Sequence, residues 1–273
     1  MLWLYQIPNW QLGLLVTGTF TLLSVIGFVL TRKWVRGFKS HHNDVVSSFV
    51  ATIGVLYAVL LAMIAVASWN NYTAVDGLVS QEADLVHAMF RDADAFPSPH
   101  RERFRTLLRD YVDTVINIEW PSLQQGLEEK RAAMAVDALF SEWGSFEPKT
   151  EKENVVATEI FQRMNNFQTV RRNRIQTGLS GLMPVLWWVV IVGAVLNLGL
   201  TFLFWMHDNK VHFVMTAVLG LTIGMVVYLI LALDHPLWGE VSVSPDAFQV
   251  VASSMDRALN PLTPGERRVS GGE

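Results

Sequence analysis

The sequence predicts an all-α protein with four transmembrane helices and a helical extramembrane insert between the second and third of them. Three observations carry this prediction. Hydrophobic residues make up 51% of the 273 residues and charged residues only 17%, a composition too apolar for an ordinary soluble domain. Four long runs contain no charged residue. The polar stretch between the second and third run repeats its apolar residues at helical spacing.

The four uncharged runs are each long enough to cross a bilayer. A helix rises about 1.5 Å per residue, so roughly 20 apolar residues cover the hydrocarbon layer. The runs are 11–30, 45–69, 182–205 and 211–233. We therefore expect a first transmembrane pair at 11–69, an insert at 70–181, a second pair at 182–233 and a tail at 234–273 with a short amphipathic helix.

Tryptophans mark the ends of these runs, where an amphipathic indole ring suits the headgroup level. They are Trp10, Trp34, Trp69, Trp205 and Trp238. The first run is not a secretory signal, because residues 1–31 lack a basic leading segment and the run is too long. We expect it to stay in the mature protein. Four spans place both termini on one side of the membrane.

The first half of the insert contains a turn and a helix. Ser98 suits an N-cap and Pro99 the first helical position, and apolar residues then recur at helical spacing over 104–118. We expect Trp120-Pro121 to stop this helix, because the residue before a proline disfavours the helical conformation.

The second half of the insert predicts two more helices. One is expected over about 122–143, followed by an exposed loop with the sequence GSFEPKTEKEN. The next starts near Asn154 and leads into the third span without a break. Its apolar face is marked by Val156, Ile160, Met164, Phe167, Val170, Arg174 and Gly178. Two long helices thus leave the membrane, with a helical hairpin between them.

The second run continues beyond the membrane, and its helical face carries an acid. This face is Val75, Leu78, Glu82, Leu85 and Met89, the seam of a helix packed on a partner. The expected partner is the antiparallel helix at 154–180.

A carboxylate in such a seam costs free energy unless it gains an ion pair. Counted from the membrane surface, Glu82 falls level with Arg171, and Asp76 with Arg174. We expect these four residues to form inter-helix ion pairs that clamp the two helices. The alternative is an ion-sensing or metal-binding role for the acids.

No Asp, Glu, Lys or Arg lies inside a span, which argues against a proton relay or a carboxylate-driven transporter. Asn197 is the one strongly polar side chain near a span centre, and we expect it to bond a neighbouring helix.

Stripes of small residues run along three of the spans. They are Gly13, Thr17, Thr21 and Ser24 in the first, Ser47, Ala51, Gly54, Ala58, Ala62 and Ala65 in the second, and Thr216, Gly220 and Gly224 in the fourth. Close helix packing explains such stripes. The alternative is a pore, in which symmetric copies each contribute the second span.

Several motifs together resemble one known family. They are SSFVATIGVLYAVLLAMIAVASWNNY at 47–72, an acid in SQEADL, an arginine-rich entry to the third span and LDHPLWG after the fourth. The pattern covers about 41–248 and resembles the bestrophin-like family of bacterial multi-pass membrane proteins, which is distantly similar to bestrophin anion channels.

The resemblance implies an oligomeric anion channel with the second span near the axis. Bestrophins have an apolar neck there, and the candidate neck residues are Val55, Leu56, Val59 and Met63. The small stripe, expected on the opposite face, competes with them for the axis. The sequence has no recognisable acidic calcium-binding loop, so the resemblance does not extend to calcium gating.

Charge indicates how the chain is oriented. The first loop carries Arg32, Lys33, Arg36 and Lys39 and is cytoplasmic by the positive-inside rule. The termini and the insert are then expected on the non-cytoplasmic side of a bacterial inner membrane. The alternative follows from the arginines before the third span and from bestrophins, whose large domain is cytoplasmic.

Other functions find little support in the sequence. Zero cysteines exclude disulfides and thiolate metal sites, and no basic cluster indicates nucleic-acid binding. The common nucleotide, zinc-protease and hydrolase motifs are missing, so we expect neither an enzyme nor a cofactor. The expected partners are the lipid bilayer, further copies of the chain and small inorganic ions. A membrane-anchored scaffold without transport is the alternative to a channel.

Overall fold

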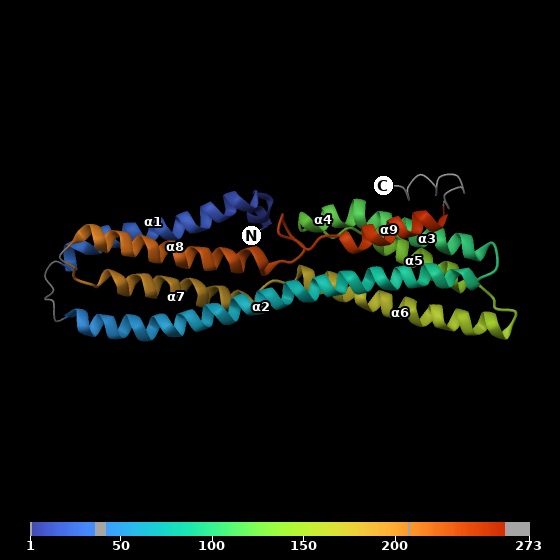
Figure 1. The fold of residues 1–273 in the computed structure, drawn as a ribbon, viewed down its shortest axis with the longest axis horizontal. Coiled ribbons are helices and arrows are strands. Elements are labelled where there is room, and N and C mark those ends of the chain that lie inside the picture. The colour runs from blue at the N-terminus through green and yellow to red at the C-terminus, as the bar shows by residue number, and fades with distance from the viewer. Residues whose placement is uncertain (1, 36–41, 207, 260–273) are drawn as a thin grey trace, which may run out of the picture. The chain divides into compact units, whose positions relative to one another are not determined.

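The computed structural model describes residues 2–35, 42–206 and 208–259. These residues form helices and no strand, and four of the helices are long and apolar enough to cross a membrane (Figure 1). The all-α prediction, with a helical insert between the second and third span, is confirmed. Arg36, Lys39, the ring of Trp34 and the tail beyond Leu259 lie outside the described residues.

The elements follow one another along the chain. They are the 3-10 helix η1 (Leu2–Gln6), α1 (Asn9–Val35), α2 (His42–Asp92), the 3-10 turn η2 (Ala93–Ala95), α3 (His100–Thr114), the π-helical turn η3 (Val115–Glu119), α4 (Trp120–Gln124), α5 (Arg131–Gly144), α6 (Glu151–Leu179), α7 (Pro184–Phe202), α8 (Asn209–Asp234) and α9 (Asp246–Leu259).

The chain divides into two compact units, Met1–Tyr72 with Ser180–Ser242, and Thr73–Leu179 with Val243–Glu273. Helix α2 contributes to both units. The segment that follows α8 groups with the spans as far as Ser242, and α9 groups with the insert.

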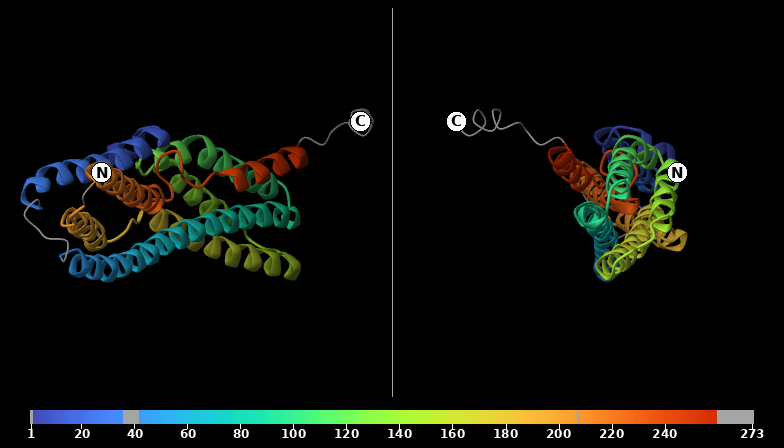
Figure 2. Two further views of the ribbon diagram at one scale, coloured as in Figure 1. Left: turned by 60° about the vertical axis from the view of Figure 1, so that its left-hand side comes forward. Right: turned by 90° about the vertical axis from the view of Figure 1, so that its right-hand side faces the viewer.

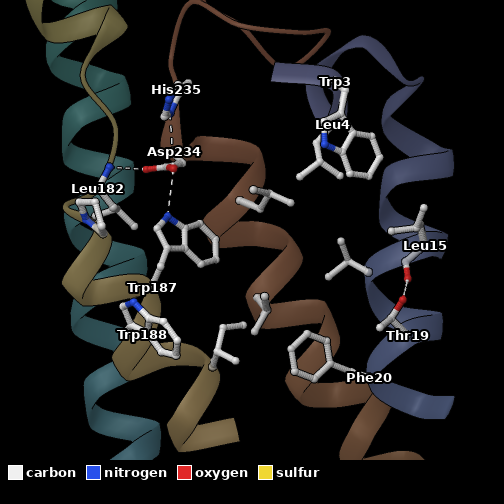
Figure 3. A pocket seen from close by; sticks show the side chains of 15 residues that line it. Trp3, Leu4, Leu15, Thr19, Phe20, Leu182, Trp187, Trp188, Asp234 and His235 are labelled. Atoms are coloured by element: carbon white, nitrogen blue, oxygen red, sulfur yellow. Dashed lines mark hydrogen bonds and ion pairs between the residues drawn. The ribbon is translucent and has the colours of Figure 1, made fainter. Parts of the chain in front are cut away.

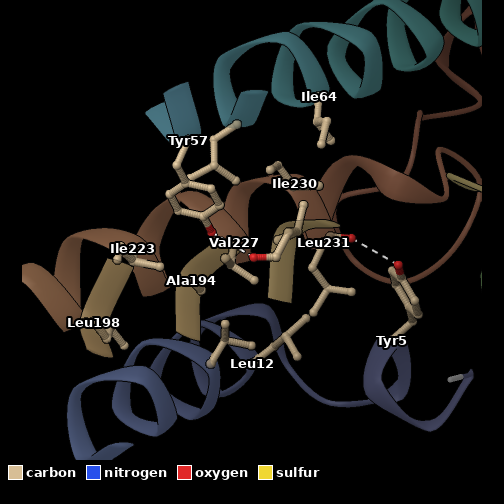
Figure 4. Close-up of a cluster of buried hydrophobic side chains, with 13 residues drawn as sticks. Tyr5, Leu12, Tyr57, Ile64, Ala194, Leu198, Ile223, Val227, Ile230 and Leu231 are labelled. Carbon is tan, nitrogen blue, oxygen red and sulfur yellow. Dashed lines mark hydrogen bonds between the residues drawn. The ribbon is translucent and has the colours of Figure 1, made fainter. Parts of the chain in front are cut away.

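The first unit contains α1, α7, α8 and the membrane part of α2. Helix α1 lies beside α8, and α7 lies between α8 and α2 (Figures 1 and 2). The core takes Tyr57 from α2, Ala194 from α7, Val227 and Ile230 from α8 and Leu12 from α1 (Figure 4). Lipid gives helices no hydrophobic drive to associate, so the fit of these side chains holds the unit together.

Helices α1 and α8 approach closely because α8 has glycines at the contact. A Cβ added at Gly220 would lie 2.4 Å from Ser24 Oγ, and one at Gly224 would lie 2.8 Å from Thr17 Cα. The small-residue stripes of the first and fourth spans therefore pack against each other within one chain, as close helix packing requires.

The second unit is a helical bundle in which α6 runs antiparallel to α2. Two ion pairs fix this direction: Arg174 meets Glu82, and Arg163 Nε lies 3.0 Å from Asp92 Oδ2. Residue numbers rise along α2 where they fall along the facing side of α6, so the expected antiparallel pairing of these helices is observed. Helix α3 packs on α5, which forms the expected hairpin between them.

Helix α9 lies on the insert. The Phe248 ring packs against Trp120 with ring centroids 6.1 Å apart. Arg109 holds Asp256 with two hydrogen bonds, of 2.7 Å from Nε and 3.0 Å from Nη2. The amphipathic helix predicted in the tail therefore buries its apolar face against protein.

Pro121 does not stop the preceding helix, contrary to the sequence-based expectation. Helix α3 continues into the π-helical turn η3, in which the Trp120 N–H bonds the Val115 carbonyl. Pro121 then lies in the first turn of α4, where a missing N–H is tolerated. Pro99, at the other end of α3, is the N-cap rather than the first helical residue, and no side chain caps this end.

The helix expected over 122–143 begins later, at Arg131. The cause is the end of α4, where Gly126 has a φ of 73°. Its N–H bonds the Leu123 carbonyl at 2.8 Å, and the Leu127 N–H bonds the Ser122 carbonyl at 2.9 Å. This pattern is a C-terminal cap that only a residue tolerant of positive φ adopts easily.

Helix α6 differs from its prediction at both ends. It starts at Glu151 because Thr150 and Glu153 form a capping box, with the Glu153 N–H 3.2 Å from Thr150 Oγ1. It ends at Leu179 instead of running into the third span. The chain is non-helical over 180–183, and Met183 is extended before Pro184, as residues before proline prefer.

Candidate functional site

The membrane part of α2 packs against its own chain through one face only. The Tyr57 hydroxyl donates to the Val190 carbonyl of α7 at 2.8 Å. Gly193 accommodates the Tyr57 ring, since a Cβ there would lie 2.4 Å from it. Leu61 and Ile64 continue this buried face. Asn197 lies nearby and donates to Gly193 of its own helix at 3.0 Å, so the expected bond to a neighbouring helix is not the one observed.

The candidate neck residues lie on the part of α2 that its own chain leaves exposed. Val55 is 64% exposed, Leu56 62%, Val59 53% and Met63 67%. Four large apolar side chains on one helix are therefore free for contact with lipid, with other copies of the chain or with a pore.

The three faces of α2 have a definite order around the helix. At about 100° per residue, the mean direction of the candidate neck residues lies about 150° from that of Tyr57, Leu61 and Ile64. The small-residue stripe lies about 90° from the buried face on the other side. It is therefore on a flank of the helix, about 120° from the neck residues rather than opposite them.

The second unit contains a buried cluster of five polar side chains, which we call the arginine cluster. Glu82 comes from α2, Tyr111 from α3, Glu119 from η3, and Arg171 and Arg174 from α6. Arg174 bridges the two acids, with Nε 2.6 Å from Glu82 Oε2 and Nη2 2.5 Å from Glu119 Oε1. Arg171 holds Glu119 through two bonds, of 3.0 and 2.5 Å.

The Tyr111 hydroxyl connects the two ends of the arginine cluster. The Tyr111 hydroxyl donates to Glu82 and accepts from Arg171 Nη1 at 3.0 Å. The guanidinium of Arg174 lies over the Trp120 ring, 5.1 Å from its centroid. Two acids face two arginines, so each buried charge has a partner of opposite sign, as burial of a charge requires.

The electrostatics of the arginine cluster favour the charged forms. Burial by itself raises the pKa of Glu119, but Arg174 and Arg171 outweigh it, so the pKa lies below its ordinary value. Burial lowers and the two acids raise the pKa of Arg174, and the acids prevail. The pKa of the Tyr111 hydroxyl is raised, first by burial and then by Glu82.

The arginine cluster has the geometry of a clamp. Glu82 and Arg174 are both fully buried, so no substrate reaches them. The bonds of the cluster join α6 to α2, α3 and η3, and α3 to α2. The register differs from the sequence-based expectation by one turn: Glu82 bonds Arg174 most closely, and Arg171 Nη1 lies 3.9 Å from it. Asp76 is exposed and is not part of the cluster.

The sequence analysis did not identify Glu119 or Tyr111 as members. A signal was present, because Tyr111, Val115 and Glu119 recur every four residues and so share a helical face. The π-helical turn keeps this row buried, and Ile118, which ordinary helical spacing places on the face, is only half-buried. Glu119 is an acid in an apolar row of η3, and like Glu82 in α2 it predicts a buried cation as its partner.

A second polar cluster joins α8 to the start of α7 in the first unit (Figure 3). The Asp234 carboxylate accepts from the Leu182 backbone N–H at 2.5 Å and from Trp187 Nε1 at 3.2 Å. It thereby satisfies a donor left free by the non-helical segment 180–183. His235 fills the space beside Gly181, where a Cβ would lie 2.0 Å from its Cε1.

Both the sequence and the fold of this chain are similar to those of known proteins. The model of the Bestrophin-like domain matches residues 18–248. A search of curated proteins found no match.

Solved structures share the fold. A crystal structure of a bacterial bestrophin homologue from Klebsiella pneumoniae with an isoleucine-to-threonine mutation has a TM-score of 0.65 and 11% identity, covering 89% of this chain and 99% of that one. A second mutant of the Klebsiella homologue, with an aspartate-to-alanine change, has a TM-score of 0.64 and 12% identity over 90% of this chain and 99% of that one. A membrane protein with a glycine-to-alanine mutation has a TM-score of 0.63 and 13% identity over 90% and 96%.

Proposed function

The chain belongs to the bestrophin-like family and is an integral membrane protein, and from this we propose that it is an anion channel assembled from several copies, with α2 lining the pore. The anion selectivity rests on the likeness to bestrophins. The placement of α2 rests on the order of its three faces.

A ring of copies accounts for every face of α2. The buried face points outward to its own α7, and the neck residues Val55 and Val59 then point to the axis. One flank carries the small stripe, and the other carries Phe49 and Leu60, which are 57% and 45% exposed. In a cyclic assembly the small flank of one copy meets the large flank of the next, a heterologous contact that closes into a ring.

The proposed pore has an apolar neck without ionisable groups. Residues 45–69 contain no charged side chain, so ions pass without a proton or carboxylate step. Apolar constrictions gate by losing their water, and the width at Val59 and Leu56 then sets the barrier.

Anion flux through purified protein in liposomes tests the channel. We expect flux above that of empty liposomes, and we expect Val59→Ala and Leu56→Ala to raise it several-fold by widening the neck. Val195→Ala is the matched control, because Val195 is a 61% exposed valine on α7. Flux that stays at the empty-liposome level in all variants leaves the scaffold as the better explanation. Replacing chloride by an impermeant anion must abolish the flux, and continued cation flux would contradict the selectivity.

Cysteine cross-linking tests the assembly separately. The chain contains no cysteine, so a single introduced thiol reports on one position. Val59→Cys treated with a short bis-maleimide in membranes should give a ladder of oligomers, and Val195→Cys should give far less. Equal yields at both positions would remove α2 from the axis.

The orientation follows from charge in the same proposal. By the positive-inside rule, Arg32 and Lys33 at the end of α1 support a cytoplasmic first loop and an insert on the far side of a bacterial inner membrane. A side-sensitive reporter fused to the C-terminus checks this assignment. Reporter activity in the cytoplasm would reverse the orientation and agree with the bestrophin arrangement, and the pore would be unaffected.

A further inference from the structure

Arg32 is a cation at the membrane edge of the first unit. It lies in the last turn of α1, and its Nε is fully buried. No residue in the described part of the chain gives Nε a hydrogen bond. A buried donor without a partner costs free energy, so Nε requires an acceptor such as a water or an anion.

The Arg32 side chain lines a small cavity of about 40 Å³. The other walls come from α1, from the α7–α8 connection and from the first turn of α8: Phe28, Phe202, Phe204, Trp205, Met206, Asn209 and His212. A water-sized oxygen atom needs at least about 10–15 Å³ of such space, so the cavity admits at most about three such atoms and not a whole phosphate group.

A buried histidine and the positive end of a helix lie at the cavity. His212 is only 7% exposed, and its Nε2 lies 3.2 Å from the Thr201 carbonyl, while its ring packs edge-on against Phe28 at 4.7 Å. The N-terminus of α8, with its partial positive charge, begins at Asn209. The nearby acid, Asp208, caps α8 by accepting from the Lys210 N–H at 2.8 Å and does not line the cavity.

The cavity also lies at the ends of two candidate spans, where lipid phosphates are expected. The candidate spans end at Lys33 in α1 and begin at Asn209 in α8, so Arg32 and the first turn of α8 mark the same membrane surface. A guanidinium offers Nε and Nη as a planar fork that matches the oxygens of a phosphate.

From these observations we propose that Arg32 and the first turn of α8 form a binding site for a phosphate group. One phosphate oxygen enters the cavity and accepts from Nε, and the rest of the group stays at the membrane surface. The phosphate comes from the headgroup of an anionic phospholipid or from free phosphate. The site lies outside α2 and is independent of the proposed conduction pathway.

Native mass spectrometry of the full chain in detergent tests the proposal with phosphatidylglycerol as the probe. Loss of a charge-assisted hydrogen bond of about 1.5–3 kcal/mol predicts that Arg32→Gln weakens binding about tenfold or more. Lys33→Gln is the matched control, because it removes the same charge from the exposed neighbouring residue at the same membrane level. We expect it to change binding by less than about twofold.

Two further arms complete the test. Thermal unfolding with inorganic phosphate identifies the source: stabilisation and displacement of lipid indicate free phosphate, and their absence together with lipid binding indicates a headgroup. Arg32→Lys keeps the charge and loses the fork, so it must bind phosphatidylglycerol several-fold more weakly even if Arg32→Gln does not fold. Equal losses in Arg32→Gln and Lys33→Gln, full binding in Arg32→Lys, or no binding of either probe would each overturn the proposal.

Discussion

Removing Glu82 from the arginine cluster should destabilise the protein strongly. Glu82→Gln leaves Arg171 and Arg174 facing one acid, and Glu82 and Arg174 are both completely buried. Breaking a buried ion pair by removing one partner costs about 3–5 kcal/mol, because the remaining charge is left uncompensated. For a chain of this size, each kcal/mol lowers the unfolding temperature by about 2–4 °C. We therefore expect a decrease of about 10 °C.

Thermal unfolding of the full chain in detergent, followed by near-ultraviolet circular dichroism, measures this effect. Trp120 contacts Arg174 and reports on the arginine cluster directly. Asp76→Asn is the control, since Asp76 is an exposed acid on the same helix and its loss should cost less than about 0.5 kcal/mol.

A double variant measures the interaction between Glu82 and Arg174. Glu82→Gln with Arg174→Met leaves Glu119 and Arg171 as a balanced pair, so the double variant should be less destabilised than the sum of the two single variants by about 1–3 kcal/mol. Strict additivity, or a Glu82→Gln protein as stable as the Asp76→Asn control, would refute the clamp.

Three other variants test further parts of the structure. The pKa of Glu119 is lowered in the folded protein, so its charge stabilises the fold above the ordinary carboxyl pKa of about 4.3. This contribution is lost as the pH falls through the folded-state pKa. Circular dichroism from neutral to acid pH should therefore show unfolding at a lower pH in wild type than in Glu119→Gln. Gly224→Ala should force α1 and α8 apart, because its Cβ meets backbone at 2.8 Å, whereas Gly18→Ala meets nothing within 4 Å and should leave the unfolding temperature unchanged. Asp234→Ala leaves the Leu182 N–H without its acceptor and should cost about 1–3 kcal/mol in detergent unfolding, and an unchanged stability would show that Asp234 does not hold the start of α7.

Patterns that depend on one helix could be predicted from the sequence. The spans follow from runs without charge, and the buried face of α6 follows from its spacing, since Ile160, Met164, Phe167, Val170 and Arg174 are all buried as expected. Even the acid in the seam of α2 indicated a buried cation partner, because a lone carboxylate is too costly there.

Features that depend on a local backbone exception could not be predicted in this way. The π-helical turn carries the chain from α3 into α4, and Pro121 lies in the first turn of α4, so it does not end the helix. The positive φ of Gly126 ended α4 early. The register between α2 and α6 shifted by a turn because the helix ends were counted from an assumed membrane surface, while the chain breaks at 180–183. Each error arises at a point where the backbone departs from regular helical spacing, so residues after that point no longer lie where the spacing predicts.

The close contact of α1 with α8 sets a requirement for biosynthesis. Ser24 and Gly220 are separated by nearly 200 residues, so at about 5–20 residues per second α1 resides in the bilayer for roughly 10–40 seconds before its partner is made. Its hydroxyls are suited to this delay, because Thr17 donates to the Gly13 carbonyl at 2.6 Å and Thr21 to the Thr17 carbonyl at 2.7 Å. The first helix to insert is thus self-sufficient in hydrogen bonding, and the last helix completes the packing without having to displace lipid from an unsatisfied polar surface.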